Sequence, residues 1–142
     1  DFVVYSPDLE FLGTLRPEQQ PLRRRELPAD AAVVWVHPAA GGGRSGSTYY
    51  RGLEQMAGPL IDAVEVFNGN WVGRRYVAEA ERLAAELGLP ATGGSDAHRA
   101  DAIMRCATDV DTGPAGLSST ADLVAALQEG RVRPWREGNH AD

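Results

Sequence analysis

Short apolar segments rich in β-branched residues alternate with helical patterns along this chain, and Gly or Pro marks most of the changes. This alternation is typical of βα units built around a parallel sheet. A run such as AVVWV, apolar throughout, indicates a strand covered on both faces. The expected strands are Phe2–Tyr5, Ala32–Val36, Ala63–Phe67 and Leu89–Thr92, with Ala107–Val110 as a candidate fifth, and the expected helices span 72–87 and 119–130.

The length limits how such units can be arranged. A chain of 142 residues fits one domain, expected to span residues 1–142, and is too short for a closed eight-stranded (β/α) barrel of roughly 250 residues. Residues 135–142 are expected to form a disordered tail. The chain starts at Asp1 rather than Met, and we expect it to be part of a longer product that lacks its N-terminal segment.

Composition excludes several function classes. All 14 basic residues are Arg, so neither a Schiff-base lysine nor a phosphate-loop lysine is present. The net charge of −6 argues against a general nucleic-acid surface. The single cysteine, Cys106, cannot form an internal disulfide and is expected to pack in the core rather than act as a nucleophile. No apolar run approaches the roughly 20 residues of a membrane span, and we expect a soluble, cytoplasmic protein with no membrane partner.

The tetrapeptide Ser95-Asp96-Ala97-His98 follows the last apolar strand. In an extended segment, residues i and i+2 point to the same side, so Asp96 and His98 could hold one metal ion together. The preceding Gly93-Gly94 pair disfavours a helix here. The pattern is short enough to arise by chance, and an ordinary polar strand end is the alternative.

His37 stands at the end of AVVWV and precedes Pro38, which favours an extended conformation for it. His37, Asp96 and His98 thus follow strands whose carboxyl ends are where parallel α/β sheets bind ligands. We expect these three side chains to lie close together as metal ligands. The mixture of imidazole and carboxylate suits Zn, Mn or Fe better than Ca. The remaining histidine, His140, is expected to be inert in the tail.

Other polar residues lie near the same strand ends. Glu65, inside an apolar strand, is costly to bury alone, so it either orients a histidine or arginine or forms a structural salt bridge. Asn68 forms a turn or contacts substrate, and regular alternation would place it on the face opposite Glu65. Arg44 and Arg99 follow the two ligand-bearing strands and would favour an anionic substrate, unless they are ordinary surface arginines.

The segments VVWVHP, IDAVEVFNGN, LAAELGLPATGGSDAH and ADLVAALQEGRVRP occur in an order that resembles the C-terminal half of the PHP (polymerase and histidinol phosphatase) family. The resemblance runs from about Asp1 to Pro134. It implies an α/β fold in which parallel βα units form about half of a distorted seven-stranded, TIM-like (β/α) barrel. It also implies divalent metal ions at the strand ends, with His37, Asp96 and His98 as ligands, Asp96 and His98 at the catalytic centre, and hydrolysis of a small anionic phosphorylated substrate by a metal-activated water.

The chain departs from the family pattern because it contains no His-x-His motif. Three ligands cannot fill two or three metal sites, so the remainder is expected from a missing N-terminal half of the barrel or from a second chain. Two other functions stay open. One is a non-catalytic α/β interaction module with a degenerate metal site, and the other is a metal-dependent amide or ester hydrolase.

Overall fold

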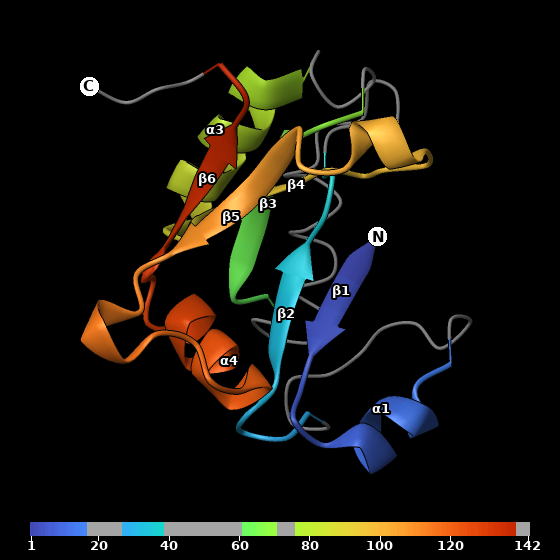
Figure 1. Cartoon of the computed structure of the whole chain (residues 1–142), viewed down its shortest axis with the longest axis vertical. Coiled ribbons are helices and arrows are strands. Elements are labelled where there is room, and N and C mark those ends of the chain that lie inside the picture. The colour runs from blue at the N-terminus through green and yellow to red at the C-terminus, as the bar shows by residue number, and fades with distance from the viewer. Residues whose placement is uncertain (17–26, 39–60, 71–75, 139–142) are drawn as a thin grey trace.

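The computed structural model describes residues 1–16, 27–38, 61–70 and 76–138, and shows a mixed α/β fold (Figure 1). A four-stranded sheet has the order β1-β2-β3-β4, and a separate two-stranded ribbon pairs β5 with β6. The strands are β1 (Phe2–Tyr5), β2 (Ala32–Trp35), β3 (Ala63–Asn68), β4 (Ala91–Gly94), β5 (Cys106–Val110) and β6 (Val132–Arg136). The adjacent strands β2, β3 and β4 are parallel, which confirms the expected βα units, and the sheet is not closed into a barrel.

Two parts of the pairing differ from a simple parallel sheet. Strand β1 runs antiparallel to β2, and β6 runs antiparallel to β5. Trp135 and Arg136 were expected in a tail, but they pair with Ala107 and Cys106 at the end of β6. Backbone pairing with β5 holds these two residues in a strand, so the expectation is wrong for them. Residues 139–142, and with them His140, lie outside the described residues.

The α-helices of the described residues are α1 (Leu9–Thr14), α3 (Val77–Leu87) and α4 (Thr120–Gln128), with short 3-10 turns at Ala100–Ala102 and Gly113–Ala115. Helix α3 ends as expected at Gly88, whose φ of 65° is the left-handed conformation that glycine adopts most readily. None of the described helices is both long and apolar enough to cross a membrane.

Helix α4 begins with a reciprocal capping box. The Ser119 side chain accepts a hydrogen bond from the Asp122 backbone N–H, and the Asp122 carboxylate accepts one from the Ser119 N–H. Hydrogen bonds from Ser118 and Ser119 lower the pKa of Asp122 to about 2. These bonds satisfy N–H groups that the first turn of a helix cannot pair internally.

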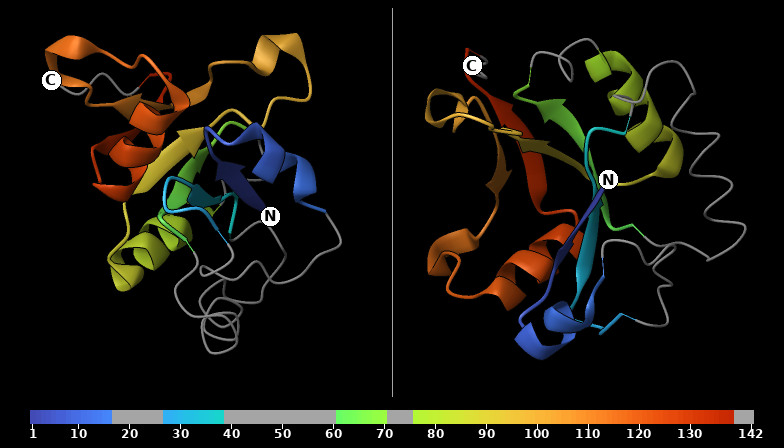
Figure 2. Two further views of the ribbon diagram at one scale, coloured as in Figure 1. Left: turned by 90° about the horizontal axis from the view of Figure 1, so that it is seen from below. Right: turned by 90° about the vertical axis from the view of Figure 1, so that its right-hand side faces the viewer.

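Helices lie on both faces of the sheet, α3 on one and α4 on the other (Figure 2), and core residues pack on each face, as AVVWV predicts. Val33 and Trp35 of β2 pack on the α3 side, whereas Ala32 and Val34 pack on the α4 side. All four residues of this strand are buried, because successive side chains of a strand point to opposite faces and a helix covers each face. The sheet thereby holds the carboxyl ends of β2, β3 and β4 in fixed positions.

The ribbon lies directly against β4 at Gly93. The Thr108 hydroxyl donates to the Gly93 carbonyl at 2.8 Å and accepts from the Gly93 N–H at 3.1 Å. A Cβ atom at Gly93 would lie 2.4 Å from the carbonyl oxygen of Ala107, closer than real contacts allow. Glycine is therefore needed here for the ribbon to approach the sheet.

Candidate functional site

A buried carboxylate, Glu65, connects the carboxyl ends of the three parallel strands. The residue is 6% exposed, and its Oε2 accepts hydrogen bonds from the His37 backbone N–H at 2.8 Å and from the Asn68 side-chain amide at 3.0 Å. Its Oε1 lies against the end of β4, where a Cβ atom on Gly94 would be only 2.1 Å away. Glu65 is thus fixed by groups that follow β2, end β3 and end β4.

Burial raises the pKa of Glu65 above its ordinary value of 4.5, since desolvation disfavours the charged form. The hydrogen bonds from Asn68 and from the His37 backbone lower the pKa in part, as does the charge of His37, while the charge of Asp96 raises it further. The carboxylate therefore keeps its proton to a higher pH than an exposed glutamate does. His37 and Asp96 both lie within electrostatic reach of this one group.

Asn68 does not follow the alternation expected from the sequence. The pairing of β3 with β4 shifts register between Glu65 and Phe67, which is the signature of a β-bulge. The irregularity turns the buried Asn68 side chain onto Glu65 rather than onto the opposite face, so that expectation is wrong. The Asn68 Oδ1 accepts a hydrogen bond from the Asn70 N–H at 2.9 Å, which makes the following turn.

His37 lies beyond the end of β2, as expected, but its backbone is not extended. Its φ is 33°, in the left-handed region that residues with a side chain rarely adopt. The hydrogen bond from its N–H to buried Glu65 accounts for this turn away from the line of the strand. The imidazole Nε2 lies 3.3 Å from Oδ2 of Asp1, the residue that precedes the antiparallel strand β1.

Asp96 and His98 also depart from extended geometry. Strand β4 ends at Gly94, and Asp96 has a left-handed φ of 44°, so the i and i+2 rule that suggested a two-residue metal clamp does not apply. The Nδ1 of His98 lies 3.0 Å from the carbonyl oxygen of Asp96 and 3.8 Å from its Oδ1. A carbonyl can only accept, so Nδ1 carries the proton in the neutral ring and Nε2 carries the lone pair. The ring is 78% exposed.

The residues that the structure describes do not by themselves fit a metal centre. Among them, no group of three or more His, Cys, Asp or Glu side chains is arranged to hold a metal ion. The imidazole of His37 faces Asp1, and that of His98 is exposed and contacts Asp96. Metal binding by His37, Asp96 and His98 stays a prediction.

The two arginines expected to contact substrate have different outcomes. Arg99 is exposed, and its Nε donates to Asp101 at 3.0 Å. Asp101 also accepts from Arg105 at 3.3 Å, so the two guanidinium groups share one carboxylate. Arg44 lies outside the described residues.

Cys106 is buried at the start of β5, in a position that suits packing.

Gly94 and Asp1 belong to this site, although neither was among the predicted site residues. Gly94 is needed because Glu65 occupies the space that a side chain there would fill. A glycine pair at the end of an apolar strand is itself a signal of close approach by another group. The contact of Asp1 with His37 depends on the antiparallel direction of β1.

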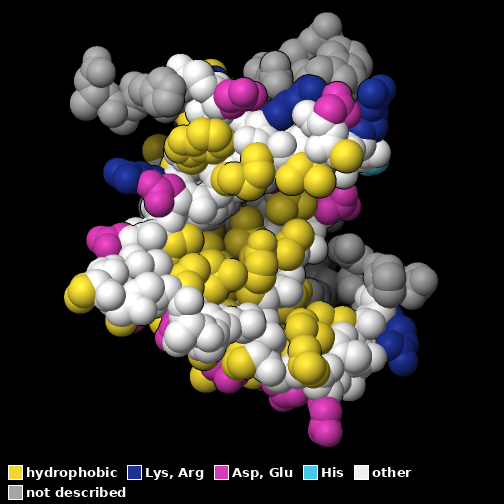
Figure 3. Space-filling view, viewed as in Figure 1, with side chains coloured by type: hydrophobic (Ala, Val, Ile, Leu, Met, Phe, Trp, Pro, Cys, Tyr) yellow, Lys and Arg dark blue, Asp and Glu magenta, His cyan; other side chains and the backbone are white. Residues whose placement is uncertain are grey.

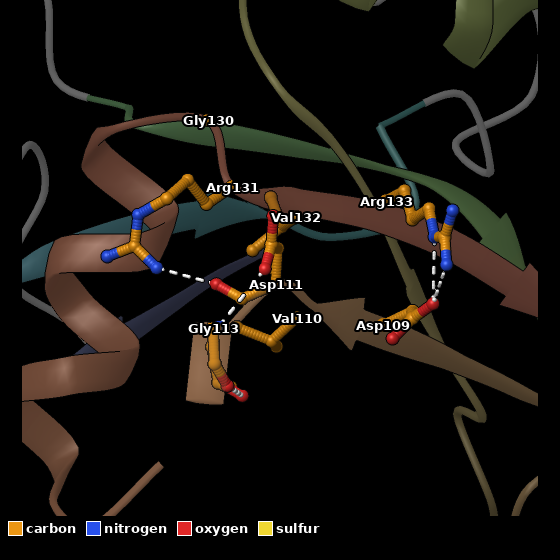
Figure 4. Close-up of a pocket in the computed structure, with 9 residues that line it drawn as sticks. Asp109, Val110, Asp111, Gly113, Gly130, Arg131, Val132 and Arg133 are labelled. Atoms are coloured by element: carbon orange, nitrogen blue, oxygen red, sulfur yellow. Dashed lines mark hydrogen bonds and ion pairs between the residues drawn. The ribbon is translucent and has the colours of Figure 1, made fainter. Parts of the chain in front are cut away.

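A cavity of about 600 Å³ lies elsewhere, at the end of the ribbon where β5 is followed by a turn and β6 begins (Figure 4). Its charged side chains are already engaged, since Arg133 pairs with Asp109 and Arg131 donates to the Asp111 carbonyl. None of the predicted site residues lines this cavity. We therefore take the group of residues around Glu65 as the candidate site, and not this cavity.

Comparison with known proteins supports the resemblance over part of the chain. A family model described as PHP-associated matches residues 75–132, a range that contains Asp96, His98 and Arg99 but neither His37 nor Glu65. No curated protein matches the chain. No solved structure matches it either. The resemblance to the C-terminal region of PHP proteins is thus confirmed for residues 75–132.

Proposed function

We propose that the chain takes part in the metal-dependent hydrolysis of small anionic phosphoesters, as the C-terminal part of a PHP-like site. In this proposal the sheet is about half of a distorted seven-stranded (β/α) barrel, and the further ligands come from an N-terminal half or from a second chain. The observation that carries the proposal is the buried Glu65 carboxylate. It gathers His37, Asn68 and the end of β4 at the carboxyl ends of parallel strands, where such folds bind ligands.

Each residue of the site has a proposed task. Glu65 positions the turn at His37 through the backbone N–H and does not touch the imidazole in the described contacts. His98 presents an exposed ring, whose Nδ1 is held at the Asp96 carbonyl, to a ligand outside. Arg99 would have to exchange Asp101 for an anionic substrate. Zn, Mn or Fe is the proposed cofactor, and when bound it would supply the Lewis acid of the reaction.

A second function is favoured by one specific observation. No described group of three or more ligand-type side chains is arranged to hold a metal, which suits a non-catalytic α/β interaction module with a degenerate metal site. In that case Glu65 is a structural carboxylate that joins three strands. The two functions differ in whether the folded protein retains metal at a defined stoichiometry.

Metal analysis combined with activity measurements on the full chain tests the proposal. The purified protein is loaded with Zn, Mn or Fe, its bound metal is measured, and it is assayed on phosphomonoesters, phosphodiesters, carboxylic esters and amides. Asp96→Ala is expected to reduce both bound metal and phosphoester turnover at least about tenfold. Even the loss of a residue that only orients a metal ligand typically costs 10- to 100-fold in metal affinity or activity. Asp109→Ala is the matched control, because it removes an exposed carboxylate whose partner, Arg133, has no proposed part in the site.

The alternatives predict other outcomes. Wild-type metal content and turnover in Asp96→Ala would make Asp96 a structural residue and overturn the proposed site. A folded protein with neither metal nor turnover would support the interaction module. Turnover restricted to carboxylic esters or amides would identify a carbonyl hydrolase, which the same chemistry permits. Circular dichroism of each variant separates loss of the site from loss of the fold.

A further inference from the structure

A second cavity, of about 500 Å³, opens at the carboxyl end of β3, between the start of α3 and the end of the ribbon where β6 stops. Its wall combines an aromatic ring, Phe67, with the aliphatic Val77 and the guanidinium-bearing Arg136. The volume falls in the range of small-molecule sites, and such sites join an apolar wall to a few placed polar groups. None of the residues predicted for metal binding lines it.

Arg136 supplies the charge of this pocket. Its guanidinium carbon lies 4.8 Å above the centre of the Phe67 ring, a cation–π arrangement, and it makes no ion pair with a carboxylate of any described residue. Arg105 also lines the pocket, but its guanidinium is engaged with Asp101. A guanidinium that lies over an aromatic ring and has no carboxylate partner among the described residues is suited to a planar carboxylate.

The other polar groups limit the charge that the pocket can accept. Glu137 lines it and disfavours a doubly charged head group, so a monoanion fits better than a phosphate dianion. The Asn68 side chain also lines the pocket, but its amide donates to Glu65 and its oxygen accepts from Asn70. Recognition of an anion is therefore left to Arg136.

We propose that this pocket binds a small monoanionic aromatic carboxylate, with its carboxylate on Arg136 and its ring against Phe67 and Val77. Asn68 belongs both to the pocket wall and to the hydrogen bonds of Glu65, so the ligand lies next to the candidate site. Binding here needs neither a metal nor hydrolysis.

A calorimetric titration of the full chain with 2-naphthoate measures the binding affinity and tests this pocket. The neutral 2-naphthamide has the same shape without the charge, and cyclohexanecarboxylate has the charge without the aromatic ring. Naphthoate is expected to bind most tightly of the three. Arg136→Gln is expected to weaken naphthoate binding about tenfold or more, the usual effect of losing a charge-assisted hydrogen bond. Arg133→Gln is the matched control, because it removes the same charge from the same strand where Asp109 is the partner.

Equal losses of naphthoate affinity in Arg136→Gln and Arg133→Gln would overturn the proposed pocket. Equal affinities of the wild type for naphthoate and naphthamide would also overturn it. Tighter binding of phenylphosphonate than of naphthoate would overturn the assignment to a monoanion. Phe67→Leu keeps apolar volume, and it is expected to reduce the preference for naphthoate over cyclohexanecarboxylate. Asp96→Ala is expected to bind naphthoate normally, so failure of the hydrolytic site and failure of this pocket remain distinguishable.

Discussion

At the scale of single residues, the site depends on backbone conformations that the sequence does not reveal. A glutamate inside an apolar strand can be singled out in advance, because its burial requires partners, and Glu65 indeed has them. The left-handed turns at His37 and Asp96 could not be anticipated, since Pro38 and the strand pattern favour extended backbone at these positions. The bulge that turns Asn68 onto Glu65 depends on pairing with β4, so the local sequence does not predict it.

Replacing Glu65 by Gln is expected to change how stability depends on pH. Because the folded-state pKa is raised, the contribution of Glu65 is fully present below its unfolded value of 4.5 and is lost as pH rises through the higher folded value. Glu65→Gln, whose amide oxygen can accept the same two hydrogen bonds, should therefore gain stability relative to wild type as pH rises. Each tenfold difference in proton affinity between the folded and unfolded states corresponds to about 1.4 kcal/mol in the free energy of unfolding.

Urea unfolding of wild type and Glu65→Gln, from about pH 4 to about pH 7, measures this difference. Glu81→Gln is the control, because it removes an exposed carboxylate on α3 and should leave the pH dependence unchanged. Parallel curves for wild type and Glu65→Gln would show that burial does not raise the Glu65 pKa.

At the scale of elements, the strands that lie in the middle of the sheet were the most predictable. AVVWV and AVEVF fell within about one residue of β2 and β3, because strands covered on both faces must be apolar throughout. The ribbon was less predictable. Pro134 argues against an interior strand, but among the described strands β6 pairs only with β5, and a two-stranded ribbon has edges that tolerate proline. The direction of β1 follows from tertiary packing and carries no sequence signal.

The contact between the ribbon and β4 is expected to depend on Gly93. Gly93→Ala would bring a Cβ atom to 2.4 Å from the Ala107 carbonyl oxygen, and it would disturb both hydrogen bonds of Thr108. Overpacking of this kind costs about 1–3 kcal/mol, which thermal or urea unfolding can measure. Gly13→Ala in α1 is the matched control, because nothing lies within 4 Å of its new methyl group, and a gain of about 0.5–1 kcal/mol is expected. Equal stability of Gly93→Ala and wild type would mean that the ribbon is not seated on β4.

At the scale of the whole molecule, the sheet is open, and apolar surface remains accessible. Hydrophobic side chains cover much of the middle of the face in Figure 3, where β2, β5 and α4 lie in Figure 1. Strand β1 pairs only with β2 in the described sheet, which leaves one edge of its backbone unpaired there. Edges of this kind pair readily with other strands unless a charge or a covering segment protects them.

This open edge leads us to expect that the chain by itself associates with other copies. Sedimentation velocity should show a weight-average sedimentation coefficient that rises with protein concentration. Val3 lies in β1, opposite Val34, and is 38% exposed, so Val3→Lys places a charge on the edge strand at little cost to the core. The substitution should shift the protein toward monomer without lowering its unfolding midpoint. A wild-type protein that stays monomeric at all concentrations and unfolds cooperatively would show that the open sheet is self-sufficient, and would favour the independent interaction module over half of a shared barrel.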